Sequence, residues 1–348
     1  MIINLNNEEI QKNSSINGQF LSASLQDINQ HCKILKSNFF LDSFNYFPIT
    51  SNYETFNELF KRQDNNSIEH FYTANFYKNL KDNENSFKVF NDCFILGSST
   101  ADNYFSNLIH FFPRIFFNNE KNINLLIHRN LSNKFRNLIM TICSIREIKV
   151  RFSYIDDEFY KFNNSSFPQF FNIENSIKIL QFFFKKILNN IDSLNYGKKI
   201  YVRREDSSYR KILNEADLIE KFRNSGFEII NPNHFKILEQ MKIFSDADLI
   251  VSAHGSNLAN IIFCKQGTKI IEVGPKFDKP YEVNILNRYN HLSNLTNLEY
   301  SKIEADSVNV SKHSYLATKY INQKILDESN YYKNLIIKVN EIENILNN

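Results

Sequence analysis

The stretch from Asp246 to Pro275, DADLIVSAHGSNLANIIFCKQGTKIIEVGP, constrains the fold of this chain most strongly. A short apolar run at Leu249–Val251 leads into a polar turn at Ser252–Asn257, and apolar residues then recur at helical spacing over Leu258–Ile262. A second apolar run follows at Ile270–Val273 and meets a Gly-Pro pair, where we expect regular structure to stop. This order predicts a strand, a tight turn, a helix and a second strand, which together form a β-α-β unit.

The turn inside this unit is a candidate ligand site. In a β-α-β unit the carboxyl end of the first strand and the amino end of the helix share one crevice, where unpaired amide N–H groups and the helix dipole favour a phosphate. Gly255 lets a ligand approach the backbone closely, and His254, Ser256 and Asn257 can donate hydrogen bonds from their side chains. The sequence therefore predicts a nucleotide-type pocket at this turn.

Strand and helix patterns alternate along most of the remaining chain, which is typical of parallel α/β sheets. In the second half, strands are predicted at Lys199–Arg203 and Phe227–Ile230, with helices that begin after Asn214 and at Phe235. In the first half, the pattern predicts strands at Cys93–Gly97, Asn124–His128 and Glu147–Phe152, and helices at Asp102–Phe117, Leu131–Ile145 and Glu174–Asn190.

The length of 348 residues suits two domains better than one core. We expect a Rossmann-like domain over residues 1–193, in which residues 1–91 show no clear pattern, and a second Rossmann-like domain over residues 194–300. A helical segment over residues 301–348 either stays with the second domain or returns to the first. The predicted fold class is thus α/β, two tandem domains whose parallel sheets face a common cleft, and that cleft is the expected ligand site.

Composition excludes several function classes. The 41 basic and 38 acidic residues nearly cancel to a net charge of +3, so a nucleic-acid binder is not expected. The four cysteines are far apart in sequence and predict neither a zinc site nor a disulfide framework. The amino terminus carries no basic leader followed by an apolar segment, which predicts a cytoplasmic protein. The amphipathic stretch Ile177–Leu188 is either a core-facing helix or a contact with the inner face of a membrane.

Three arginines follow the predicted strand at Lys199–Arg203. Arg203, Arg204 and Arg210 would stand at its carboxyl end or in the loop beyond it, where a guanidinium can grip a diphosphate with two hydrogen bonds. The alternative is a solvated loop in which neighbouring acidic residues, Glu205 among them, pair with these arginines. Position favours the ligand site, because this loop and the His-Gly-Ser-Asn turn open on the same edge of one sheet.

Two acidic motifs are candidate metal sites. Asp246 and Asp248 form an Asp-x-Asp pair, and residues 156–158 form an acidic cluster. The Asp-x-Asp pair precedes its strand, so it lies at the edge opposite the predicted crevice, whereas a metal that bridges a diphosphate needs carboxylates beside the phosphates. We therefore predict no metal site. No GxGxxG follows any predicted strand, which argues against a dehydrogenase.

The ordered pieces of the second half resemble the carboxyl-terminal domain of glycosyltransferase family 61, a group with plant, animal and bacterial polysaccharide members. The resemblance covers Lys199–Gly274 and rests on a strand that ends in arginine, Arg210-x-x-x-Asn214-Glu215, Gly226-Phe227-Glu228, Glu239-Gln240, the run Ala247–Val251, the turn His254–Asn260, and Ile271-Glu272.

A weaker match lies upstream, at Asn103–Arg114. Here the chain departs from the family pattern at two positions. Ser106 stands where a histidine is common, and His110 stands where an acidic residue is common.

The resemblance implies a GT-B architecture and inverting transfer from a nucleotide sugar, expected to be UDP-linked, with no metal and no cofactor. It implies acceptor-side roles for Asn103 and Arg114, and a contact between Glu272 and the ribose hydroxyls. The residues expected to bind the donor are Arg203, Arg204, Arg210, His254, Gly255, Ser256, Asn257, Leu258 and Glu272.

Inversion also requires a base that takes the proton of the acceptor hydroxyl. We predict His110, because an imidazole has a pKa of about 6.5 and suits this task at neutral pH. The alternative is that His110 only packs among Phe111 and Phe112, in which case Asp102 or Glu205 is the base.

Three function classes follow from the sequence. The first is a cytoplasmic, bacterial-type hexosyl- or pentosyltransferase that acts on a glycan or lipid-linked glycan in surface polysaccharide synthesis, such as capsule or O-antigen. The second is a nucleotide-sugar epimerase of the same architecture. The third is a non-catalytic nucleotide-sugar-binding subunit of a polysaccharide synthase, which the departures at Ser106 and His110 suggest.

Overall fold

The structure is a computed structural model of the chain. It describes residues 2–3, 18–25, 30–43, 45–56, 59–60, 74–99, 102–192, 194, 196–205, 207–276, 287–310, 321–338 and 340–342. The fold is mixed α/β, with two main sheets of mostly parallel strands. Two compact units are present, Met1–Phe182 and Phe183–Asn348. The division falls within helix α6 (Ile173–Asn189), ahead of the boundary at 193–194 expected from the sequence.

The first unit, called unit 1 here, is built on an eight-stranded sheet in the order β2-β3-β10-β7-β8-β9, with β4 on β3 and β6 on β10. Strands β7, β8 and β9 run parallel to one another, and β10 runs parallel to β7. Strands β2, β3 and β4 are antiparallel additions. The strands are β2 (Gly18–Leu25), β3 (Gln30–Asp42), β4 (Phe47–Thr50), β6 (Lys88–Asn91), β7 (Cys93–Ile95), β8 (Asn122–His128), β9 (Lys149–Ile155) and β10 (Phe159–Pro168).

A separate two-stranded sheet pairs β1 (Ile2–Ile3) with β5 (Thr55–Phe56) in parallel. The helices of unit 1 are α3 (Ala74–Asn83), η3 (Glu84–Ser86), α4 (Tyr104–Ser106), η4 (Asn107–Phe111), η5 (Phe112–Phe117), α5 (Asn133–Ile145) and the first part of α6.

The helix predicted at Asp102–Phe117 is present from Tyr104 onward, but its geometry changes along its length. The Asn103 side chain caps it by accepting a hydrogen bond from the Ser106 N–H at 3.0 Å. The α-helical turn then widens into the π-helix η4 and tightens into the 3-10 helix η5, which begins at Phe112 and Pro113. Proline has no N–H to donate, so the α-helical ladder cannot continue through it.

The second unit, called unit 2 here, contains a six-stranded sheet in the order β12-β11-β13-β14-β15-β16. The first five strands are parallel and β16 is antiparallel to β15. The strands are β11 (Lys199–Val202), β12 (Glu228–Ile230), β13 (Leu249–Ala253), β14 (Lys269–Pro275), β15 (Glu299–Val308) and β16 (Asn334–Ile336).

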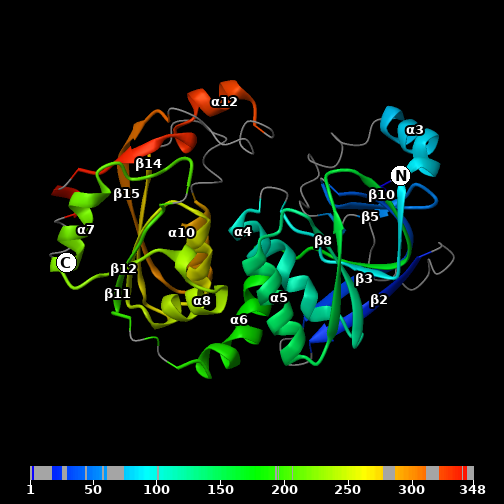
Figure 1. Ribbon diagram of the computed structural model, residues 1–348, viewed down its shortest axis with the longest axis horizontal. Helices are drawn as coiled ribbons and strands as arrows, with labels where there is room; N and C mark the ends of the chain where they lie inside the picture. Colours follow the sequence, from blue (N-terminus) through cyan, green and yellow to red (C-terminus); the bar gives the residue numbers. More distant parts are fainter. Residues whose placement is uncertain are drawn as a thin grey trace. The chain divides into compact units, whose positions relative to one another are not determined.

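Helices cover both faces of this sheet. Helix α7 (Glu215–Asn224) lies on one face, and α8 (Ile237–Asp246) and α10 (Arg288–Leu295) lie on the other (Figure 1). The 3-10 helix η7 (Ser256–Phe263) packs with α8 and α10. The remaining short helices are η6 (Pro232–His234), α12 (Gln323–Glu328) and η9 (Asn330–Tyr332).

Two details differ from the sequence-based expectation for the β-α-β unit. The helix after the turn is a 3-10 helix. Strand β14 also includes Gly274 and Pro275, which pair with Glu304 and Ala305 of β15, so the strand ends at the Gly-Pro pair as expected but extends two residues beyond the apolar run. Pro275 is the last residue of the strand.

Phenylalanine packing dominates the core of unit 1. Phe39 stacks on Phe162 with ring centroids 5.3 Å apart, and Phe167 and Phe170 pack around the same centre. In helix α6, Ile177 and neighbouring apolar side chains are buried, as the core-facing alternative requires. Within the described ranges, no helix is both long enough and apolar enough to cross a membrane.

Candidate functional site

The candidate site of unit 2 forms around the turn that follows β13. His254 is the first residue after this strand, and its Nδ1 lies 2.5 Å from Oε1 of Glu272 in β14. The Tyr300 hydroxyl donates to the other oxygen of Glu272 at 2.8 Å. Burial lowers the pKa of His254 to about 4 against the opposing effect of Glu272, so the imidazole is neutral at pH 7. Nδ1 then carries the proton and donates to Glu272, which fixes the tautomer and the orientation of the ring.

Gly255 brings an arginine onto the turn. A side-chain carbon built at Gly255 would lie 2.0 Å from Nη1 of Arg204, so the guanidinium occupies the space that any other residue would fill. The backbone of Gly255 is extended, and it is this close approach that requires the glycine. The Gly255 carbonyl also accepts from the Tyr289 hydroxyl at 2.6 Å.

Arg210 ties the turn to the carboxyl-terminal segment. Its Nε donates to the His254 carbonyl at 2.9 Å, and its Nη1 donates to the Tyr331 carbonyl at 3.0 Å. The guanidinium lies 3.9 Å from the Tyr331 ring centre and 4.6 Å from that of Tyr209. Three segments far apart in sequence therefore meet at one point.

Positive charge is concentrated at this point. Burial and the charge of Arg210 lower the pKa of Arg204 to about 10. Burial alone would raise the pKa of the Tyr331 phenol, but the charges of Arg210, Arg288 and Arg204 outweigh it, and this pKa lies below its usual value. In the described part of the chain, neither Arg204 nor Arg210 forms an ion pair with a carboxylate. Clustered guanidinium groups of this kind favour a polyanionic ligand.

Arg203 and Glu205 take a different arrangement. Nη2 of Arg203 lies 2.8 Å from Glu205 and 3.0 Å from Glu215, and Glu205 also accepts from the Asn231 amide at 2.8 Å. The solvated, paired loop that the sequence left as an alternative is therefore what the structure shows for these two residues. Arg204 and Arg210 instead lie against the turn at His254 and Gly255.

The other residues predicted for the donor site separate into two groups. Ser256 and Asn257 are half-buried at the start of η7, beside the turn. Leu258 and Glu272 are fully buried, Leu258 in the core and Glu272 behind His254 with both oxygens hydrogen-bonded. As placed, Glu272 orients His254, and its contact with a ribose stays a prediction.

The residues predicted on the acceptor side lie in unit 1. His110 is on η4, and its ring lies edge-on to that of Phe105 with ring centroids 5.8 Å apart. Asp102 accepts from the Asn107 amide at 3.0 Å and from the Ser132 N–H at 3.1 Å, and burial raises its pKa.

Asn103 is exposed and caps α4, so its side chain has a structural task. Arg114 is completely buried and donates to the carbonyls of Leu96 and Pro168 at 2.5 to 3.1 Å. It joins the ends of β7 and β10 inside the core, and its acceptor-side role stays a prediction.

The Asp-x-Asp pair lies at the opposite edge of the unit 2 sheet, as expected. The Asp248 N–H donates to the Lys198 carbonyl at 2.7 Å, ahead of β13. Asp248 also lines a cavity of about 860 Å³ with Lys199, Lys269 and Glu299, at the amino ends of the parallel strands. Among the described residues, no group of three or more His, Cys, Asp or Glu side chains is arranged to hold a metal ion.

Sequence reasoning missed Tyr289, Tyr300 and Tyr331. Nothing in their local sequence marks them, since the chain contains 17 tyrosines and these three have no common motif. Only the fold brings them to the His254 turn.

A model of one known protein family matches the chain. The glycosyltransferase 61 family model matches residues 70–271, which include Arg204, Arg210, His254 and Gly255. The matched span is more than half of the 348 residues. The chain belongs to glycosyltransferase family 61. Family membership confirms the resemblance and supports glycosyltransferase activity. No curated protein matches the chain.

Proposed function

We propose that this family 61 protein transfers a hexose or pentose from a nucleoside diphosphate sugar, with uridine as the expected base, to a glycan or lipid-linked glycan acceptor. The transfer inverts the anomeric centre and uses neither a metal nor a cofactor. The protein is a bacterial-type cytoplasmic enzyme of surface polysaccharide synthesis, such as capsule or O-antigen. The observation that carries the proposal is the placement of Arg204 and Arg210 against the His254–Gly255 turn, where carboxylate partners are absent from the described residues.

The proposed chemistry follows from the charge of this site. When the bond between the sugar and the diphosphate breaks, negative charge develops on the leaving diphosphate. Guanidinium groups of Arg204 and Arg210, together with the amino end of η7, stabilise that charge in a partly desolvated position. These groups perform the task that a divalent metal performs in metal-dependent transferases.

Nucleotide binding to variants tests the donor site. At a diphosphate concentration 100-fold above Kd, binding stabilises the folded protein by about 2.7 kcal/mol. We expect UDP to raise the Tm of the wild type equally with and without a chelator. Arg204→Ala should lose most of this rise. Arg203→Ala is the control: it breaks the pairs with Glu205 and Glu215, so it should lower the starting Tm and keep the rise.

Product analysis separates the three function classes. Release of nucleoside diphosphate that depends on an acceptor supports the transferase. A change in the donor sugar without an acceptor would indicate the epimerase, and nucleotide binding without turnover in any acceptor mixture would indicate the non-catalytic subunit. A Tm that responds to no nucleotide would overturn the donor site itself.

A further inference from the structure

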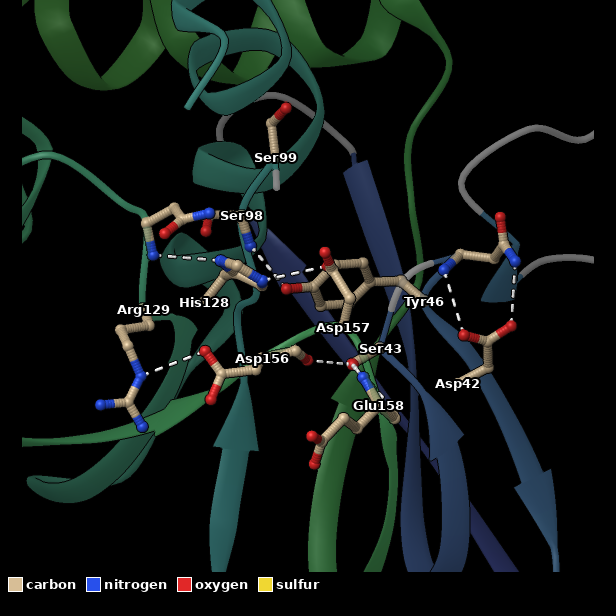
Figure 2. Close-up of polar contacts among 12 residues, drawn as sticks. Asp42, Ser43, Tyr46, Ser98, Ser99, His128, Arg129, Asp156, Asp157 and Glu158 are labelled. Atoms are coloured by element: carbon tan, nitrogen blue, oxygen red, sulfur yellow. Dashed lines mark hydrogen bonds and ion pairs between the residues drawn. The ribbon is translucent and has the colours of Figure 1, made fainter. Parts of the chain in front are cut away.

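A second polar cluster lies in unit 1, at the carboxyl ends of its parallel strands (Figure 2). Ser98 follows β7, His128 ends β8, and Asp157 follows β9. The strand register places these ends side by side, because the Gly97 N–H donates to the Leu126 carbonyl and His128 pairs with Ile155. The carboxyl edge of a parallel sheet is where such domains bind ligands.

His128 and Asp157 form a hydrogen-bonded pair with a defined tautomer. Nδ1 of His128 accepts from the Asn130 N–H at 3.0 Å, so the proton of the neutral ring is on Nε2. Nε2 therefore donates to Oδ1 of Asp157, at 3.1 Å. The imidazole is 2% exposed and the carboxylate is 16% exposed, so Asp157 is the member of the pair that a ligand can reach.

Ser98 supplies an unsatisfied hydroxyl at the same edge. Its N–H donates to the Tyr46 hydroxyl at 3.1 Å, and the Tyr46 ring packs on Gly97 so closely that a side-chain carbon there would lie 2.2 Å from the ring. Ser98 is 1% exposed, and its Oγ has no hydrogen-bond partner among the residues that the structure describes. A buried hydroxyl without a partner is unfavourable, so the described residues leave a hydrogen-bonding group unsatisfied beside His128 and Asp157.

The loop that carries Asp157 is held in place by its neighbours. The Ser43 hydroxyl contacts the carbonyls of both Asp156 and Glu158, the latter at 2.7 Å (Figure 2). The side chain of Asp156 points to Arg129, with Nε and Oδ1 3.1 Å apart. Adjacent aspartates thus differ in partner: Asp156 pairs with an exposed arginine and Asp157 with a buried histidine.

We propose that this edge binds the attacking hydroxyl of the acceptor sugar and that Asp157 is the catalytic base. The inference rests on the proposed function. The acceptor oxygen forms a bond to the anomeric carbon as the bond from that carbon to the diphosphate oxygen breaks. The hydroxyl proton passes to the Asp157 carboxylate, and the nucleoside diphosphate leaves with the bonding electrons. His128 is a positioning residue, because its Nε2–H holds the carboxylate in one orientation.

Matched aspartate variants test the assignment. Nucleoside diphosphate release is measured from a panel of UDP-sugars with methyl glycosides as acceptors. Asp157→Asn keeps the shape and the bond from His128 but removes the basic oxygen, so we expect kcat to fall about 100-fold or more. Asp156→Asn removes the same charge one residue away and should stay within about threefold of the wild type. The Tm rise with UDP should be unchanged in both variants.

Two histidine variants test the positioning role. His128→Gln keeps a donor directed at Asp157 and His128→Phe does not. We expect kcat in His128→Phe to fall nearly as far as in Asp157→Asn. In His128→Gln, kcat should be about tenfold or more higher than in His128→Phe. This comparison is needed because His128 is buried. If its role were purely structural, the loss of kcat would follow the loss of Tm in each variant.

The possible outcomes decide the inference. Near wild-type turnover in Asp157→Asn, or an equal loss in Asp156→Asn, would overturn it. If the wild type binds UDP but releases no UDP from any donor sugar, the proposed function fails. Binding of sugar at this edge is then tested by saturation-transfer NMR with the methyl glycosides alone. Binding that Asp157→Asn weakens and Asp156→Asn leaves unchanged would support the sugar-hydroxyl site, and no binding to the wild type would overturn it.

Discussion

Gly255 has no side chain, and the guanidinium of Arg204 occupies the space beside it. This close approach leads to a prediction for a single substitution. In Gly255→Ala the new methyl group would meet Nη1 of Arg204 at 2.0 Å, and the flexible guanidinium must move away. Extended backbone accepts alanine without strain, so we expect stability to change by less than about 0.5 kcal/mol. UDP affinity, measured by calorimetry, should fall about tenfold or more, since a hydrogen bond to a charged group contributes about 1.5–3 kcal/mol.

A double-mutant cycle sharpens this prediction. If Gly255→Ala acts only by displacing Arg204, the double variant with Arg204→Ala should bind UDP no more weakly than Arg204→Ala alone. Gly226→Ala is the opposite control. Gly226 has a φ of +79° with no atom within 4 Å of the added carbon, so alanine there should cost about 1 kcal/mol of stability and leave affinity unchanged. Additive losses in the double variant would contradict the proposed displacement.

Prediction from the sequence succeeded for residues whose loops open on the same edge of one sheet. Arg204, Arg210 and the His254 turn meet because strand order brings their loops together, and alternation of strand and helix was enough to predict that. It did not anticipate the complete burial of Arg114 and Glu272, whose residue types match a family pattern. Burial decides what those two charges contact, and burial depends on packing that no local pattern records.

At the scale of elements, the short strand β16 anchors the carboxyl-terminal segment to unit 2. The Leu335 N–H donates to the Lys211 carbonyl, and the Leu213 N–H donates to the Leu335 carbonyl, both at 2.8 Å. The Leu335 side chain is fully buried in the same core as Ile212 and Ile337. This segment carries Tyr331, so its docking also holds the ring and carbonyl that contact Arg210.

Leu335→Ala tests that anchor. Truncation of a buried leucine costs about 2–5 kcal/mol, and we expect a loss of this size in urea unfolding together with weaker UDP binding. Ile336→Ala is the matched control, because Ile336 is the next residue of the same strand and is 39% exposed. It should cost less than about 1 kcal/mol. Equal losses in the two variants would mean that β16 does not dock as the structure shows.

Elements with strong periodicity were predicted well and the others were not. The alternating segments from Cys93 to Val273 form strands and helices close to the predicted positions. The strands within residues 1–91, and β10, β15 and β16, gave no usable signal. Strands β2, β3 and β16 are stabilised by antiparallel partners, and such pairing between chain segments is not visible in the local pattern of either segment.

At the scale of the whole molecule, each unit has its own polar site at the carboxyl edge of a parallel sheet. Unit 2 gathers guanidinium groups around Gly255, and unit 1 gathers a carboxylate, an imidazole and hydroxyl groups around Asp157. Under the two proposals, the first set binds a diphosphate and the second binds sugar hydroxyls, so each unit would handle one of the two substrates.

Hydrogen exchange with mass spectrometry tests this division in the intact protein. Amides slow their exchange where a ligand suppresses local opening, so UDP should protect peptides that cover residues 203–211, 253–258 and 329–335 of unit 2. The peptides that carry Ser98 and Asp157 should not change with UDP and should respond to an acceptor glycoside instead. In Arg204→Ala the UDP pattern should disappear while the glycoside pattern persists. Protection of the Asp157 loop by UDP with no change at Gly255 would reverse the assignment, and would place the nucleotide in unit 1.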